Sequence, residues 1–320
     1  MKDDFKKFYK ELKNDIYHIR KNIDYIHNIS GKLRIVIFFD ILYSALRYGI
    51  SDNEYRIFEF YKIKKDKRKT YLSISKHNRI AWHLESLKDE LLINKKDFNK
   101  EFEDYLNRNI LEINKLSFKE FEDFAFDSKK VIARSSKESF IKSYKVYDLS
   151  NYRSPAFMLD DIKKNKHDLV EKDVFTNKIL SKINSDLVII NVTTLKLEII
   201  SSSLKFKENN HIISGCIDIK KGTIKGHFKD EDGNNYSNEF EGYEIPKFDE
   251  IIKITKELAD KLYEVSEVEW TFSINNKGNV CLLDANKWED FVFAQTPEFL
   301  ISRIGILPKY KKLLSIWRRI

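Results

Sequence analysis

Glycine is missing from the long central stretch of this 320-residue chain. There are nine glycines in all, and none falls between Gly49 and Gly215. Because glycine supplies the backbone freedom that tight turns require, a long segment without it favours helices over hairpins. Throughout the first half of the chain, apolar residues at spacings of three and four predict helices. The predicted helices cover residues 5–23 (the stripe Phe5, Phe8, Tyr9, Leu12, Ile16, Ile19 and Ile23), 35–48, 53–60, 80–93 and 98–110.

The pattern changes near Ser117. The segment Ser117-Phe118-Lys119-Glu120 is typical of a capping box that opens a helix. Short apolar runs and β-branched alternation then predict strands, followed by one long amphipathic helix over 248–265 and a closing hairpin. The strands are expected at 131–133, 144–149, 168–171, 186–194, 197–206, 212–219, 268–274 and 280–284. A helical N-terminal region followed by an α+β body is therefore predicted.

The composition is that of a folded globular chain, with 42% hydrophobic and 34% charged residues. Two cysteines, Cys216 and Cys281, are too few for a disulfide framework and fit a reducing compartment. No apolar run approaches the ~20 residues that span a bilayer, and residues 1–4 alternate in charge unlike a signal peptide. We therefore expect a cytoplasmic location and no transmembrane segment.

Basic residues exceed acidic ones by 58 to 50, and they gather in two places, Lys62–Lys69 and Trp317–Arg319. One interpretation is a solvated lysine-rich surface, and the other is contact with phosphates or with an anionic membrane surface. Binding to nucleic acid would require a basic stripe with interleaved aromatic residues or a known motif. Neither is present, so no nucleic-acid partner is expected.

Three oxygen-bearing side chains are expected to converge on the predicted C-terminal hairpin. Glu269 and Asp284 are nearly equidistant from the turn, which predicts that they are cross-strand neighbours, and Asn286 shares the face of Asp284 by period two. Neighbouring carboxylates repel unless a cation offsets their charge, and oxygen ligands suit Mg²⁺. The alternative is a solvent-facing hairpin with incidental acids.

The same residues carry a resemblance to a known family. The sequence over 268–272 (VEWTF), a turn and the sequence over 282–286 (LLDAN) resemble the metal-binding end of the ATP-grasp fold. More particularly, the chain resembles the sugar-transfer associated ATP-grasp proteins of polysaccharide biosynthesis, diffusely over residues 36–297. The further matching pieces are Asp40–Ser44 with Gly49 and Glu54–Tyr55, Asn94–Phe98, Leu169–Glu171, Gly215–Ile219 and Gly242–Pro246.

The resemblance implies an ATP-grasp fold, in which two α+β subdomains clamp ATP, preceded by a helical N-terminal region. The implied division is residues 1–93 for the helical region and 94–171 for the first subdomain. Residues 172–320 would form the second subdomain, with the metal site and a C-terminal helix. The implied metal ligands are Glu269, Asp284 and Asn286.

The resemblance also assigns residues to the nucleotide. Lys95 matches a lysine that reaches the phosphates, and Arg134 stands where the family has a phosphate-binding lysine. Glu171, with the backbone from Lys172 to Val174, matches the hinge that receives adenine. Lys205 falls near a family arginine that contacts the transferring phosphate or substrate. The alternatives are that Lys95 and Lys205 are surface lysines and that Arg134 is only a salt-bridge partner.

Two departures from the family are visible. The glycine-rich flap that covers the phosphates is replaced by Ser135–Ser139, which holds no glycine, and the segment Asn191–Thr194 lacks the family's arginine. Serine hydroxyls and a lysine ammonium could substitute as donors, in a less pliable loop.

The activity implied by the resemblance is ligation that depends on ATP and Mg²⁺. A carboxylate is activated as an acyl phosphate and coupled to an amine or another nucleophile, in the assembly of cell-surface polysaccharide. Two alternatives remain open: a non-catalytic nucleotide-binding relative that acts as scaffold or regulator in glycan assembly, and an ATP-grasp kinase. The missing flap glycines favour the non-catalytic relative.

Overall fold

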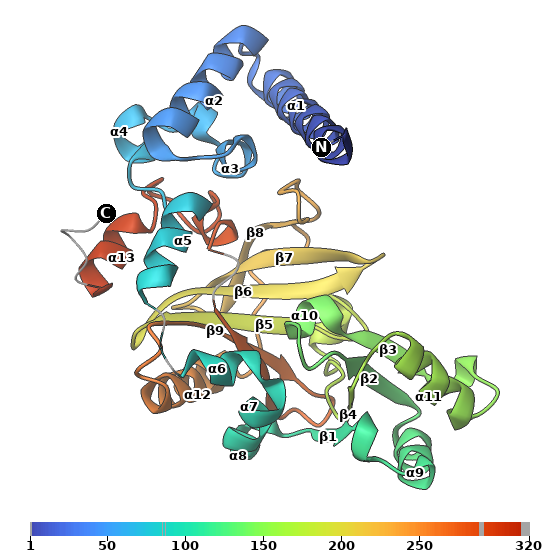
Figure 1. Cartoon of the computed structure of the whole chain (residues 1–320). Helices are drawn as coiled ribbons and strands as arrows, with labels where there is room; N and C mark the ends of the chain where they lie inside the picture. Colours follow the sequence, from blue (N-terminus) through green and yellow to red (C-terminus); the bar gives the residue numbers. More distant parts are fainter. Residues whose placement is uncertain (1, 85, 87, 288–290, 315–320) are drawn as a thin grey trace. The chain divides into compact units, whose positions relative to one another are not determined.

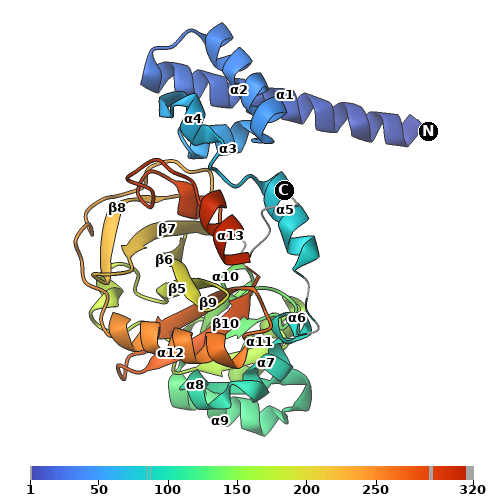
Figure 2. The ribbon, with the colours of Figure 1, turned by 90° about the vertical axis from the view of Figure 1, so that its left-hand side faces the viewer.

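A computed structural model describes residues 2–84, 86, 88–287 and 291–314, with side chains from residue 16 onward. The chain divides into two compact units (Figures 1 and 2). The first comprises Met1–Leu84 and Asp290–Ile320, and the second comprises Glu85–Glu289. Two features singled out in the sequence fall outside the described part. They are the side chains of Phe5, Phe8, Tyr9 and Leu12, and the basic segment Trp317–Arg319.

The described residues of the first unit form helices, as predicted for the N-terminal region. Its aromatic core includes Tyr55, Phe58, Phe60 and Tyr71, whose rings contact one another. The elements are α1 (Lys2–Ser30), α2 (Arg34–Tyr48), α3 (Asp52–Ile57), η1 (Phe60–Lys62), α4 (Lys65–Arg68), α5 (Ile74–His83), η5 (Phe293–Gln295) and α13 (Leu307–Leu314).

The second unit contains a four-stranded antiparallel sheet, hereafter sheet 1, in the order β1-β4-β2-β3. Its strands are β1 (Asn109–Glu112), β2 (Lys130–Arg134), β3 (Lys145–Asp148) and β4 (Leu169–Lys172). Helices α9 (Phe118–Ser128) and α11 (Pro155–Lys164) pack their apolar residues on one face of it. Ser117 and Glu120 form the predicted capping box at the start of α9.

The second unit also contains a six-stranded antiparallel sheet, hereafter sheet 2, in the order β10-β9-β5-β6-β7-β8. Its strands are β5 (Ile189–Leu195), β6 (Glu198–Glu208), β7 (His211–Asp218), β8 (Thr223–Lys229), β9 (Glu267–Ile274) and β10 (Val280–Asn286). Helix α12 (Phe248–Lys261) contacts β5 and β9 along one face of this sheet (Figure 2). Phe98 and Phe102 join the same core.

Short helices complete the second unit. They are α6 (Asp89–Ile93), α7 (Lys95–Glu101), α8 (Glu103–Leu106), η2 (Ile113–Lys115), α10 (Phe140–Ser143), η3 (Leu149–Asn151) and η4 (Leu180–Lys182). The fold is α+β, with a helical N-terminal region and two sheet-containing subdomains, so the predicted fold class is confirmed.

Three local predictions are wrong. The helix expected over 80–93 is two helices, α5 and α6, and the helix expected over 98–110 gives way at Asn109 to strand β1. Strand β8 was not predicted, because Gly226 and polar residues interrupt its alternation. Among the described residues, no helix has the length and hydropathy needed to cross a membrane.

Gly215 on β7 tests how tightly the core of sheet 2 is packed. A Cβ at this position would lie 2.2 Å from Cε1 and 2.5 Å from Cδ1 of Phe228, whose ring is buried in the core. We predict that Gly215→Ala lowers the free energy of unfolding by about 1–3 kcal/mol, the usual cost of overpacking. Denaturant titration measures this loss of unfolding free energy, with Ser214→Ala as the control variant. Equal stability of the Gly215→Ala variant and the wild type would contradict this packing.

Candidate functional site

The two faces of sheet 2 differ in chemistry. Side chains alternate along each strand, so Ile190 and Val192 of β5 enter the core beneath the sheet while Asn191 and Thr193 point to the opposite face. The strand pairing places polar residues of four strands on that opposite face, hereafter the polar face. They include Asn191, Thr193, Ser201, Ser203, Lys205, Glu269, Thr271, Asp284 and Asn286.

A β-bulge places the acidic residues of β10 on the polar face. Val280 and Leu282 belong to the core, and in a regular strand Asp284 would follow them there. The register shifts between Leu282 and Asp284, so that Asp284 pairs with Thr271 and Asn286 pairs with Glu269. The predicted direct pairing of Glu269 with Asp284 is therefore wrong: the two carboxylates are diagonal neighbours on one face.

Asp284 and Asn286 together hold the ammonium group of Lys95. Lys95 Nζ lies 2.8 Å from Asp284 Oδ1 and 2.7 Å from Asn286 Oδ1, and it also donates to the backbone oxygens of Leu92 and Ala285. Asp284 also accepts a hydrogen bond from the backbone N–H of Phe140, at 2.9 Å. Lys95 is buried, so the alternative of a surface lysine is excluded.

Glu269 is held in the same way. Asn191 Nδ2 donates to Glu269 Oε1 at 2.8 Å, and Lys205 Nζ lies 3.5 Å from the same oxygen. Lys205 is also buried, which again excludes a surface position. Each carboxylate on the polar face is thus paired with an ammonium group, which offsets the cost of burying its charge.

The donor set suits a hard divalent cation. Two carboxylates and one amide oxygen share one face, and Lys95 Nζ shows that a cation is favourable between Asp284 and Asn286. A metal ion bound there would take the place of that ammonium group. Among the described residues, no group of three or more His, Cys, Asp or Glu side chains is placed to hold a metal by itself.

Glu171 on β4 lies between two buried arginines. Arg134 Nε of β2 donates to Glu171 Oε1 at 2.7 Å, and Arg108 Nη1 donates to Glu171 Oε2. Arg108 also donates from Nε to the Leu282 backbone oxygen at 3.0 Å and from Nη2 to that of Leu283 at 2.8 Å. These three residues, hereafter the Arg–Glu–Arg triad, connect sheet 1 to strand β10 of sheet 2.

The triad carries one more positive than negative charge. Burial alone would raise the pKa of Glu171, but the Arg108 and Arg134 guanidinium groups hold that pKa below its ordinary value, so the carboxylate is ionised. Burial lowers the pKa of Arg108. Within the described part of the chain, Arg134 Nη1 and Nη2 are buried without a hydrogen-bond acceptor, although the guanidinium carbon lies 5.0 Å from the centre of the Phe140 ring.

The predicted adenine hinge follows β4. Val174 is fully buried, and it packs in an apolar cluster with Phe140 and Tyr144 and with residues of both sheets. The Lys172 side chain, in contrast, pairs with Asp127 and lies over the ring of Phe124. A base that reaches the backbone of residues 172–174 from the side of Val174 would thus enter a region that this apolar cluster now fills.

The segment Ser135–Ser139, which replaces the glycine flap, is held by hydrogen bonds at Ser136. The Ser136 backbone N–H and hydroxyl both donate to the carboxylate of Asp168, at 2.6 and 2.5 Å. The predicted substitution of serine donors for flap glycines therefore does not extend to Ser136, whose donors are already used. Ser139 begins α10 without a side-chain capping bond.

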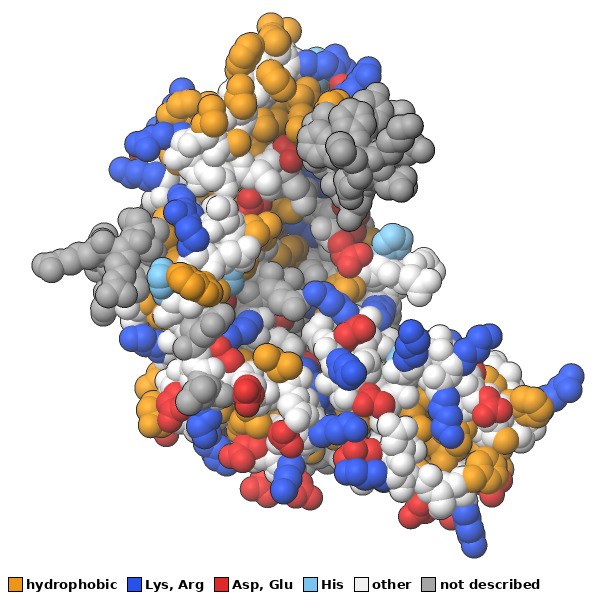
Figure 3. Space-filling view, in the orientation of Figure 1, with side chains coloured by type: hydrophobic (Ala, Val, Ile, Leu, Met, Phe, Trp, Pro, Cys, Tyr) orange, Lys and Arg blue, Asp and Glu red, His pale blue; other side chains and the backbone are white. Residues whose placement is uncertain are grey.

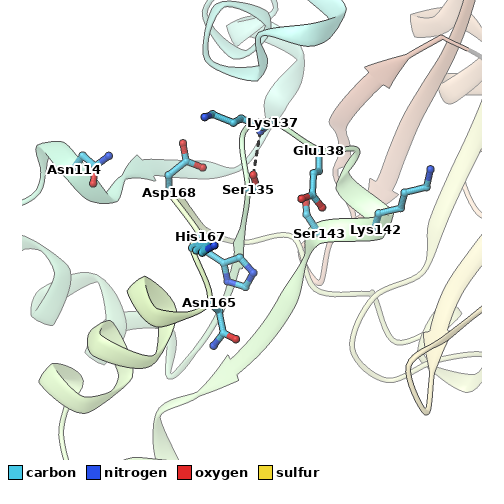
Figure 4. A pocket seen from close by; sticks show the side chains of 10 residues that line it. Asn114, Ser135, Lys137, Glu138, Lys142, Ser143, Asn165, His167 and Asp168 are labelled. Carbon is cyan, nitrogen blue, oxygen red and sulfur yellow. Dashed lines mark hydrogen bonds between the residues drawn. The ribbon is translucent and has the colours of Figure 1, made fainter. Parts of the chain in front are cut away.

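A cavity of about 620 Å³ lies beside this segment (Figure 4). The residues that line it are all polar or charged, and three of them are lysines. Arg134 immediately precedes Ser135, the first residue of the flap segment in its wall. The lining residues are Asn114, Ser135, Lys137, Glu138, Lys142, Ser143, Asn165, Lys166, His167 and Asp168. Burial lowers the pKa of His167, with Lys145 and Lys207 adding to the effect, so its imidazole is uncharged at neutral pH.

Sequence reasoning missed three residues of this region: Arg108, Phe140 and Asp168. Arg108 lies in a segment whose apolar spacing indicated a helix, and a buried arginine has no periodic signal of its own. Asp168 could have been found, since it is the first residue of the strand predicted over 168–171; in the structure it directly precedes β4, whose Leu169 pairs with Arg134.

Comparisons by sequence find no matching family model and no matching curated protein. Solved structures do match. The ATP-grasp ligase PsnB, complexed with a minimal precursor, Mg and ADP, aligns at 12% identity with a TM-score of 0.42, over 72% of this chain and 60% of PsnB. The macrocyclase MdnC from Microcystis aeruginosa, bound with its precursor peptide MdnA, aligns at 11% identity with a TM-score of 0.43, over 79% of this chain and 72% of MdnC. D-alanine–D-alanine ligase from Bacillus anthracis aligns at 13% identity with a TM-score of 0.40, over 70% of this chain and 65% of the ligase. The chain thus covers less than two thirds of PsnB.

Glu171 provides a test of the triad. We predict that Glu171→Gln lowers the free energy of unfolding by about 3–5 kcal/mol, because it leaves two buried guanidinium groups without a counter-charge. The contribution of the ionised Glu171 carboxylate to the free energy of unfolding is fully present above the ordinary glutamate pKa of 4.5. It is lost as the pH falls through the lower pKa that Glu171 has in the folded state. Denaturant titration at neutral pH measures the difference.

The matched control is Glu112→Gln. This partly exposed carboxylate pairs with Lys96 and Lys115 at the surface, and its loss should cost less than about 1 kcal/mol. An equal loss of unfolding free energy in the two variants would mean that the triad does not stabilise the fold as proposed.

Proposed function

We propose that this chain is a ligase dependent on ATP and Mg²⁺ that activates a carboxylate as an acyl phosphate and couples it to an amine. The observation that carries the proposal is the buried Arg134 guanidinium, whose two terminal nitrogens lack acceptors among the described residues. A buried cation with unused donors is costly. A phosphate group supplies both the charge and the acceptors, and it matches the planar guanidinium fork.

The same proposal assigns the neighbouring residues. ATP would be clamped between residues 94–171 and residues 172–289, the part of the expected second subdomain (172–320) that lies in the second unit. Its phosphates would lie at Lys95 and Arg134 and its base at Glu171, Lys172 and Val174. Glu269, Asp284 and Asn286 would hold Mg²⁺. When bound, the metal would neutralise charge on the phosphates. Lys95 supports this arrangement, because its ammonium group already lies among the proposed metal ligands and can follow the phosphates.

The chemistry is a balanced pair of transfers. A carboxylate oxygen attacks the γ-phosphorus of ATP, and ADP leaves. The amine nitrogen then attacks the acyl carbon, inorganic phosphate leaves, and the amine loses a proton. Arg134 and Lys205 would stabilise the charge that develops on the transferring phosphoryl group. We place the acidic substrate in the cavity lined by Lys137, Lys142 and Lys166, whose charges favour a carboxylate.

The proposal also covers the acceptor substrate and the cellular location of the reaction. The resemblance to sugar-transfer associated proteins supports an acceptor that is a surface glycan or its precursor. A cytoplasmic location fits the two buried cysteines, Cys216 and Cys281, which are not joined in a disulfide.

A second candidate function is a non-catalytic nucleotide-binding protein that acts as scaffold or regulator in glycan assembly. The position of α10 favours it. Phe140 belongs to the same buried apolar cluster as Val174, and its backbone N–H donates a hydrogen bond to Asp284. Ser136 is likewise held by Asp168. Turnover would require this segment to move, whereas simple nucleotide sensing would not require a complete catalytic site.

Titration calorimetry with ATP tests the nucleotide site. We predict that Arg134→Met weakens ATP binding about tenfold or more, since a hydrogen bond to a charged group contributes about 1.5–3 kcal/mol. The variant also removes the Arg134 donor to Glu171 Oε1, so thermal melting must show that it remains folded with Glu171 and Arg108 as a neutral pair. The exposed Arg153→Met is the control and should bind ATP as the wild type does.

The metal ligands are tested in the same titration. We predict that Mg²⁺ strengthens ATP binding by the wild type and has no effect on the Glu269→Ala plus Asp284→Ala variant. Equal, metal-independent binding in both proteins would contradict the assignment of the site.

Product analysis separates the candidate functions. We predict that incubation with ATP, Mg²⁺ and a pool of uronic acids and amines releases ADP only when both an acid and an amine are present, with formation of an amide. A phosphorylated hydroxyl product without an amide would indicate a kinase. ATP binding without ADP release would indicate the non-catalytic relative.

A further inference from the structure

Helix α2 presents an apolar face that its own unit does not cover. Ile37, Ile41, Ser44 and Tyr48 are buried against the aromatic core of the first unit. The residues on the opposite side are large, apolar and exposed, and at 3.6 residues per turn they span about 160° of the helix. They are Ile35, Val36, Phe38, Phe39, Leu42, Tyr43 and Leu46, hereafter the α2 apolar face.

The exposure of this face is large. Leu46 is 81% exposed and Phe39 is 58% exposed. Single exposed apolar residues are common on proteins, but a contiguous set on one helix marks an interaction surface. Figure 3 shows hydrophobic side chains gathered over α2, with lysine and arginine side chains beside them.

The rim of the face is basic. The exposed Lys62, Lys64, Lys65 and Lys69, hereafter the lysine cluster, lie on and around α4. Helix α4 is fixed to α2, because Arg68 pairs with Asp40 of α2 at 2.7 Å and the Tyr48 hydroxyl donates to the Lys65 backbone oxygen at 3.1 Å. Lys65 Nζ lies 4.8 Å from the centre of the Tyr43 ring, at the edge of the α2 apolar face.

Acidic groups offset this rim only in part: Lys62 pairs with Glu59 at 3.0 Å, which leaves the charges of Lys64, Lys65 and Lys69 in excess. Asp40 is engaged by Arg68 and by the Tyr55 hydroxyl. Within α2 and α4, both fully described, Asp66 is the one exposed acid. Arg47 adds a further exposed positive charge next to Leu46. A partner for this surface must therefore be apolar at its centre and negatively charged around it.

We propose that the α2 apolar face and the lysine cluster dock the protein onto an anionic lipid bilayer. The acyl boundary receives the apolar side chains, while the lipid phosphates pair with the lysines. A second copy of the chain fits less well, because a two-fold contact through α2 would bring two lysine clusters together. This docking is independent of the proposed ligase activity.

Vesicle flotation of the full chain tests the proposal. We predict binding to vesicles of equal parts phosphatidylcholine and phosphatidylglycerol and weak binding to phosphatidylcholine alone. Phe39→Ser plus Leu46→Ser should lower the partition coefficient at least about tenfold. Lys64→Gln plus Lys65→Gln should lower it several-fold, as should about 1 M salt, at which charges are screened over about 3 Å.

Matched controls use exposed residues of the second unit. Phe126, 57% exposed, and Leu197, 54% exposed, are replaced together by serine, and Lys220 and Lys221 together by glutamine. These variants should bind vesicles as the wild type does. All replaced side chains are exposed, and thermal melting checks that each variant folds.

Three results would overturn the proposal. The first is no flotation with anionic vesicles, and the second is equal binding to neutral vesicles. The third is a concentration-dependent dimer that Phe39→Ser plus Leu46→Ser abolishes while vesicles remain unbound, which would show that a second copy covers the face.

Discussion

The buried pairing of Arg108 and Arg134 with Glu171 is the interaction on which the proposed site depends. Arg134 and Glu171 belong to adjacent strands of sheet 1, and Arg108 reaches the backbone oxygens of Leu282 and Leu283 in sheet 2. Those two oxygens immediately precede Asp284, at the bulge that turns this residue onto the polar face. The position of the predicted metal ligand is therefore coupled to the charge balance of the triad.

The charges around the polar face favour a particular kind of ligand. Asp284 and Glu269 are each balanced by a lysine, whereas the triad keeps one positive charge in excess. A metal ion alone would only replace an ammonium group that is already well bound. A metal ion that arrives with a polyphosphate brings negative charge for Lys95 and Arg134 as well. Electrostatics thus favour joint binding of nucleotide and metal over binding of the metal by itself.

The sequence predicted most strands and the common face of Glu269, Asp284 and Asn286, because β-branched alternation and period two are local properties. It predicted the wrong pairing for Glu269, because a bulge leaves no mark in the alternation around Leu283. It missed β1 and Arg108, because apolar spacing over 98–110 suits a helix. The hydrogen bond of Ser136 to Asp168 and the packing of Phe140 and Val174 in one apolar cluster depend on tertiary contacts. No single-sequence pattern encodes them.

A crystal structure with magnesium and a non-hydrolysable ATP analogue tests the central claim most directly. The account predicts a phosphate oxygen within hydrogen-bond distance of Arg134 Nη1 or Nη2. It also predicts a metal ion at Glu269, Asp284 and Asn286, with Lys95 moved onto the phosphates and Phe140 displaced from Val174. A nucleotide bound elsewhere, with Lys95 still held by Asp284 and Arg134 still without an anion, would contradict it.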